Sequence, residues 1–176
     1  INKDILKKYE DIFNEINKKQ EIDFECESLS YEYYENDGVL SLVMVNPTES
    51  GGCFICETYN IDISKQKEIN NKELLEKIEI DERDLNDKIL KAIEGAKLYS
   101  SDASTSEDLK TFIKEQESKT TDKYKKISVD DVEIYLNEEN NLCAYLEVYA
   151  IAGGETMTII LDLEENEIVE LDKFGR

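Results

Sequence analysis

The chain has 176 residues, 40% of them hydrophobic, and a formal net charge of −21 from 42 acidic and 21 basic side chains. This charge argues against nucleic acid as a partner and against direct binding to an anionic membrane surface, because both would repel it. It suits a basic partner, or simply a solvated acidic surface. The sequence contains no His, which excludes Ser-His-Asp and Cys-His catalytic pairs and zinc sites built on imidazole.

The first third of the chain predicts a helix followed by strands. Residues 2–20 repeat apolar side chains at intervals of three and four, as in an amphipathic helix that faces a core. Apolar and polar residues alternate over 22–26 and 29–33, whereas 39–45 are almost wholly apolar, which indicates a strand buried on both faces. Residues 35–38 read Glu-Asn-Asp-Gly, and Asp-Gly accepts the positive φ angles of a tight hairpin turn.

The middle of the chain predicts a further strand and two capped helices. Residues 53–63 are typical of a strand that follows a loop over 47–52. Residues 70–73 have the pattern of a capping box before a short helix. Asp81 then caps a second helix, which we expect to end at Gly95.

The last third of the chain predicts one more helix and a second set of strands. Residues 104–107 resemble a capping box and begin a helix that passes through Ile113, before a polar link over 119–126. The strands that follow are expected at residues 132–136, 142–150, 157–163 and 168–171.

The order of helix, strands, helices and strands predicts an α+β fold with antiparallel pairing rather than alternating βαβ units. We expect two lobes, each an antiparallel sheet with helices packed on one side. The first lobe covers residues 1–99 and the second covers residues 100–176, and together they form one compact unit.

The stretch Gly51-Gly52-Cys53-Phe54-Ile55-Cys56 raises the question of a metal or redox site. In an extended strand, positions i and i+3 point to opposite faces, so Cys53 and Cys56 would diverge. Redox C-x-x-C pairs usually open a helix instead. Cys26 and Cys143 fall within strand patterns, as small apolar residues do. We therefore expect core thiols or an incidental disulfide, with no metal and no cofactor.

Five residues near the predicted hairpin turn are candidate ligand contacts. Strand tyrosines form either an exposed aromatic platform or half-buried packing, and neighbouring carboxylates suit a basic ligand. The candidates are Tyr31, Tyr33, Tyr34, Glu35 and Asp37. The chain has too many carboxylates for an acid/base pair to be recognised, and it lacks calcium and phosphate loops. We therefore predict no catalytic residues and no enzyme.

Several stretches, taken in order, resemble one bacterial extracytoplasmic family. They are "INKDILKKYEDIFNEINKKQ", "LSYEYYENDGVLSLVM", "GGCFICETYNIDISKQKEINNKELL" and "IYLNEENNLCAYLEVYAIAGGETMTIILDL". The family is the paired domain of unknown function found in RsiV-type, lysozyme-sensing anti-sigma factors and N-terminal to some peptidoglycan deacetylases. The resemblance covers residues 1–163 and rests on motif order, and here the Gly-Gly pair is followed by Cys-Phe rather than the family's Ala-His.

The resemblance implies a non-catalytic extracytoplasmic sensing or binding module of a bacterial cell-surface or lipoprotein-like protein. It implies a membrane or lipid anchor upstream of residue 1, and a basic protein partner such as a cell-wall hydrolase. It also implies that the Gly-Gly loop is a structural junction between strands. The alternative, from a different class, is an intracellular acidic immunity-type protein that masks a basic toxin.

Overall fold

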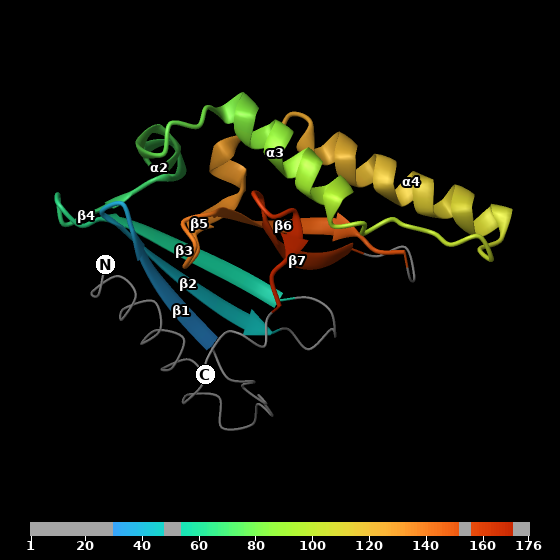
Figure 1. Ribbon diagram of the computed structural model, residues 1–176, viewed down its shortest axis with the longest axis horizontal. Helices are drawn as coiled ribbons and strands as arrows, with labels where there is room; N and C mark the ends of the chain where they lie inside the picture. The colour runs from blue at the N-terminus through green and yellow to red at the C-terminus, as the bar shows by residue number, and fades with distance from the viewer. Residues whose placement is uncertain (1–29, 48–53, 152–155, 171–176) are drawn as a thin grey trace, which may run out of the picture.

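The computed structural model describes residues 30–47, 54–151 and 156–170. Within these residues the chain forms two four-stranded antiparallel sheets, each a meander in which consecutive strands are neighbours (Figure 1). The first sheet contains β1 (Ser30–Asn36), β2 (Val39–Pro47), β3 (Phe54–Asp62) and β4 (Lys67–Ile69). The second sheet contains β5 (Glu133–Leu136), β6 (Leu142–Tyr149), β7 (Thr156–Asp162) and β8 (Glu167–Ile168).

Three α-helices and a short 3₁₀ helix connect the two sheets. They are α2 (Asn71–Lys77), α3 (Glu82–Gly95), α4 (Glu107–Tyr124) and η1 (Val129–Asp131). The side chains of Asn70, Asp81 and Ser106 cap the three α-helices by accepting backbone N–H bonds from the first turn. The structure therefore confirms the predicted α+β class with two antiparallel lobes.

The main core lies between the helices and one face of the second sheet. Buried residues of α2 and α3, among them Leu74, Leu85 and Ile89, share one cluster with Leu146 and Leu161 of β6 and β7. Figure 1 shows α3 and α4 side by side over this sheet. The predicted boundary at residues 99 and 100 stays a prediction, although residues from both sides of it share this core.

The other face of the second sheet packs against the first sheet. A smaller buried cluster joins Val43, Val45 and Cys56 of the first sheet to Tyr135 and Ile160 of the second. Each sheet thus has one face in this contact. The face of the first sheet that points away from the second sheet is called the outer face below.

A buried polar link fixes β5 against the first sheet. Ser41 and Asn60 are buried neighbours on β2 and β3, and Ser41 Oγ donates to Asn60 Oδ1 over 2.7 Å. Asn60 Nδ2 donates to the Ile134 carbonyl over 2.8 Å, and the Leu136 N–H donates to Ser41 Oγ over 3.2 Å. These side chains satisfy backbone groups of β5 that have no strand partner on that side, which an unpaired buried edge requires.

Three details of the predicted elements are wrong. The capping box predicted over 104–107 would make Ser104 the N-cap, but α4 is capped by Ser106, whose side chain accepts from the Leu109 N–H. Residues 119–126 are not a polar link, because α4 continues to Tyr124. Its polar Thr120 and Tyr124 face inward, where Thr120 Oγ1 accepts from the Tyr149 N–H at 3.0 Å and Tyr124 Oη donates to the Glu147 carbonyl at 3.0 Å. The strand predicted over 39–45 is not buried throughout, because Leu40 and Leu42 on the outer face are only half-buried.

The hairpin turn between β1 and β2 is confirmed. Asp37 and Gly38 have φ angles of 47° and 74° and form the two-residue loop that Asp-Gly predicts. The short strand β4 was not predicted. The expected helix over 2–20, the strand over 22–26 and the Gly51-Gly52 loop lie outside the described residues.

Candidate functional site

The two sheets end their third strands in the same kind of turn. Asp62 closes β3 and Asp162 closes β7, and both carboxylates are buried. Four residues later, Gln66 and Asn166 have positive φ angles of 50° and 59°. The two turns therefore repeat each other, and they allow a comparison within one molecule.

The Asp62 carboxylate is paired with a positively charged side chain. One oxygen of Asp62 accepts from Ser64 Oγ at 2.6 Å and from the Lys65 N–H at 3.0 Å. The other oxygen forms an ion pair with Lys77 Nζ at 3.0 Å. Hydrogen bonds from the Ser64 hydroxyl, the Lys77 ammonium and the Lys65 backbone hold the pKa of Asp62 well below its usual value.

The turn at Asp162 is held by neutral groups. One oxygen of Asp162 accepts from the backbone N–H groups of Glu164 and Glu165, each at 2.9 Å. The other accepts from the side-chain amides of Asn137 at 2.9 Å and Asn141 at 3.0 Å. Within the described part of the chain, no lysine or arginine forms an ion pair with Asp162. Its negative charge is therefore hydrogen-bonded, with no neutralising cation among the residues that the structure describes.

An acidic cavity of about 550 Å³ adjoins this second turn. Its walls come from β1, from β5 and the β5–β6 turn, and from the region between the end of β7 and the residues after β8. No lysine or arginine lines it among the described residues. Five of its lining side chains are carboxylates, namely Glu138, Glu139, Asp162, Glu165 and Glu167. Its electrostatic character favours a cation.

A pair of tyrosines forms an aromatic wall of the acidic cavity. Tyr34 and Tyr135 both line it, and their rings are stacked with centroids 6.1 Å apart and planes 13° apart. Burial, followed by negative neighbours that include Glu32, Glu138 and Glu139, raises the pKa of Tyr34 to about 12. Both causes disfavour the charged phenolate, burial more strongly than the negative neighbours.

The hydroxyl of Tyr135 is an unusual group in this wall. The Tyr135 side chain is fully buried, and its hydroxyl has no nitrogen or oxygen hydrogen-bond partner among the described residues, although the Cys143 thiol lies close enough to interact with it. Burial, followed by Cys143 and Tyr34, raises its pKa far above the usual value. Since buried polar groups are nearly always paired, this hydroxyl calls for an explanation.

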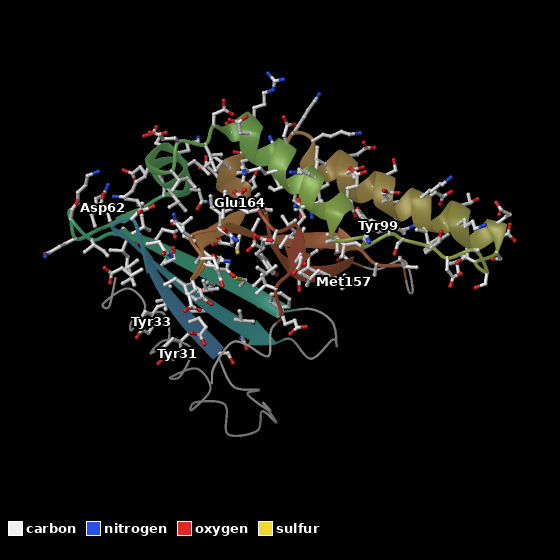
Figure 2. All side chains as sticks on the ribbon, viewed as in Figure 1. Tyr31, Tyr33, Asp62, Tyr99, Met157 and Glu164 are labelled. Carbon is white, nitrogen blue, oxygen red and sulfur yellow. The ribbon has the colours of Figure 1, made fainter. Side chains whose placement is uncertain are left out.

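The structure separates the five candidate residues predicted from the sequence. Tyr31, Tyr33 and Glu35 project from the outer face, where the two tyrosines are 58% and 66% exposed (Figure 2). Tyr34 points to the opposite face and lines the acidic cavity. Asp37 lies in the β1–β2 turn, where its carboxylate accepts from Asn140 Nδ2 at 2.9 Å. One of the five therefore meets the acidic cavity.

The cavity residues on the second sheet were missed by the sequence analysis. They are Tyr135, Asn137, Glu138, Glu139, Asn141, Asp162, Glu165 and Glu167. A signal for part of this set existed, because residues 61–69 read "IDISKQKEI" and residues 161–169 read "LDLEENEIV". Aligning the two stretches superimposes Asp62 on Asp162. It also shows lysines in the first turn where the second has glutamates.

The thiols that the structure describes are core groups. Cys56 and Cys143 are buried and free, and they belong to the apolar cluster between the sheets. Burial is the largest cause that raises the pKa of each thiol to about 12, so both are protonated at neutral pH. Among the described residues, no three His, Cys, Asp or Glu side chains gather as a metal site. Cys26 and Cys53 lie outside the described residues.

Comparison of the sequence with family models and with curated proteins gave no match. The likeness to the paired domain of anti-sigma factors therefore stays a prediction. No helix in the described part of the chain is long and apolar enough to span a membrane.

Proposed function

We propose that this chain is a non-catalytic binding module whose partner is a basic protein. The observation that carries the proposal is the acidic cavity, which has five carboxylates and no lining cation among the described residues. The net charge of −21 supports it, because a field of this sign attracts basic molecules over long distances. The setting we propose is the outside of a bacterial cell, on the strength of the sequence resemblance.

The proposal of a non-catalytic role rests on the lack of an activated nucleophile among the described residues. The chain has no His to activate a serine or a thiol. Burial raises the pKa of both Cys56 and Cys143 to about 12, which keeps them in the unreactive thiol form. The acidic groups are then best understood as binding groups.

Affinity and specificity would come from different parts of the molecule. The overall field accelerates the encounter and weakens as salt rises. Specificity requires contacts that remain when the field is screened, and the acidic cavity with its aromatic wall is one source of them. The exposed Tyr31 and Tyr33 on the outer face are a second source, since aromatic side chains are frequent anchors of interfaces.

The test is a titration of a lysozyme-type cell-wall hydrolase against the chain at low and at physiological salt. An acidic protein of similar size is the control. We expect saturable binding of the hydrolase at both salt concentrations, with an association rate that falls as salt rises. Binding no better than that of the control would contradict the proposal, and so would binding that disappears entirely at physiological salt.

A further inference from the structure

The turns at Asp62 and Asp162 differ in whether a positive side chain pairs with the aspartate. At Asp62, Lys77 supplies a positive charge 3.0 Å from the carboxylate. At Asp162, the equivalent oxygen accepts from the amides of Asn137 and Asn141 and has no ion-pair partner in the described part of the chain. A carboxylate surrounded by other carboxylates is repelled by them unless a cation is present. The cavity thus lacks, within the described residues, the kind of group that its counterpart contains.

The aromatic wall of the cavity indicates which kind of cation would bind there. A planar cation can lie over the face of a tyrosine ring, which is favourable by the cation–π interaction. The Tyr135 hydroxyl has no nitrogen or oxygen partner among the described residues but is closed to solvent, so it accepts a hydrogen bond from such a cation only if the ligand opens the wall around it. Tyr34 and Tyr135 therefore offer contacts that a simple metal ion would not use.

The distribution of the carboxylates also favours an organic cation. They come from two separate segments, with Glu138 and Glu139 in the β5–β6 turn and Glu165 and Glu167 after β7. These side chains do not form a cluster that fits a metal ion among the described residues. A guanidinium carries five N–H donors in a planar fork, so it can bind carboxylates on more than one side at once.

We propose that the acidic cavity receives one arginine side chain, with its guanidinium between the carboxylates of the two segments and beside the Tyr34–Tyr135 wall. A volume of about 550 Å³ is within the range of small-molecule sites and admits a whole side chain. The identification of this arginine as one of a basic partner protein rests on the function proposed above. The cavity itself can be tested without that partner.

The first experiment compares two small ligands on the whole chain at physiological salt. N-acetyl-arginine amide presents the guanidinium, and N-acetyl-citrulline amide is its neutral isostere. We expect the arginine ligand to bind at least tenfold more tightly, measured by calorimetry or by NMR chemical shifts. Equal binding of the two ligands, or no binding of either, would overturn the proposal.

The second experiment asks whether binding depends on the cavity or on charge in general. The double variant Glu138→Gln/Glu139→Gln removes two carboxylates of the cavity. The control, Glu94→Gln/Glu115→Gln, removes two exposed carboxylates from α3 and α4 and changes the net charge equally. We expect the cavity variant to lose at least tenfold in affinity for the arginine ligand and the control less than twofold. Similar losses would show that only the overall field acts, and would contradict the proposal.

The two proposals fail separately. If the arginine ligand binds in the cavity while the basic protein does not bind, the cavity is correct and the proposed partner is wrong. If the basic protein binds, but binds Glu138→Gln/Glu139→Gln equally well and is not displaced by the arginine ligand, the function stands and the arginine site is overturned. Thermal denaturation of each variant verifies that the fold is intact before either result is interpreted.

Discussion

The turns at Asp62 and Asp162 have the same backbone design and opposite electrostatic surroundings. In each, a buried aspartate at the end of the third strand accepts hydrogen bonds from the next few residues, and a residue with positive φ follows. Lys77 pairs with the first aspartate, whereas neutral amides bond to the second and four glutamates line the cavity beside it. The comparison teaches that the aspartate serves the fold in both sheets. Asp162 has no counter-charge among the described residues, and this difference is the basis of the proposed binding site.

The largest loss of stability is expected when the neutralised aspartate is altered. Asp62→Asn keeps the size of the side chain but removes the ion pair with Lys77 and places an amide donor beside that ammonium. Asp162→Asn also disturbs hydrogen bonds, yet it relieves repulsion from the neighbouring glutamates, which offsets the loss. Chemical denaturation should therefore show a lower midpoint for Asp62→Asn than for Asp162→Asn. The reverse order would break the comparison.

The second prediction concerns how α3 holds the second turn. A Cβ added to Gly95 would lie 2.6 Å from the Cβ of Asn166, so Gly95→Ala forces the helix and the turn apart. We expect a cost of about 1–3 kcal/mol, as for other overpacked sites. The double variant Gly95→Ala/Asn166→Gly removes the opposing atom and suits the positive φ, and it should recover part of the loss. An unchanged unfolding free energy for Gly95→Ala would contradict this tight contact.

Lowering the pH should reduce the stability that Asp62 contributes to the fold. The pKa of Asp62 is lowered in the folded state, so its contribution to stability is present above the unfolded value, about 4, and is lost as the pH falls below it. Glu73, Asp102 and Glu147 also have lowered pKa values and contribute to the same acid loss. Between pH 7 and pH 3, the wild type should therefore lose more stability in denaturation than Asp62→Asn does. Equal losses would show that Asp62 is not linked to folding in this way.

The smallest effect is expected at the cavity wall. Tyr135→Phe removes a buried hydroxyl that has no nitrogen or oxygen hydrogen-bond partner among the described residues. Leaving such a group unpaired is unfavourable, so its removal should raise the free energy of unfolding by up to about 1 kcal/mol. A clear destabilisation would show that the hydroxyl is paired in the free protein, and would remove it from the set of groups that await a ligand.

Local signals in the sequence were sufficient for much of the fold. Asn70 and Asp81 cap helices because their side chains satisfy backbone N–H groups within three residues, and such short-range rules can be read directly. The end of α4 could not be predicted in this way. Its Gln116 and Thr120 look like surface residues but are buried, and Thr120 bonds to Tyr99 and to the Tyr149 N–H of distant β6.

The acidic cavity depends on contacts that no local pattern contains. Tyr34 and Tyr135 are about one hundred positions apart in the chain, and they stack only because β5 docks on the first sheet through Ser41 and Asn60. The tyrosine cluster in β1 drew attention to a strand that lines the acidic cavity. Alternation along that strand then places Tyr34 in the cavity and Tyr31 and Tyr33 on the opposite face. The repeated Asp turns were the one accessible clue to the other side of the cavity.

The most direct test of the unneutralised cavity is a crystal structure of the chain determined with N-acetyl-arginine amide. The account predicts a guanidinium within hydrogen-bond distance of the carboxylates around Asp162, beside Tyr34 and Tyr135. It also predicts no second ligand at Asp62, because Lys77 already occupies that position. A cavity without ligand at a saturating concentration, or a guanidinium bound at Asp62 instead, would contradict the account.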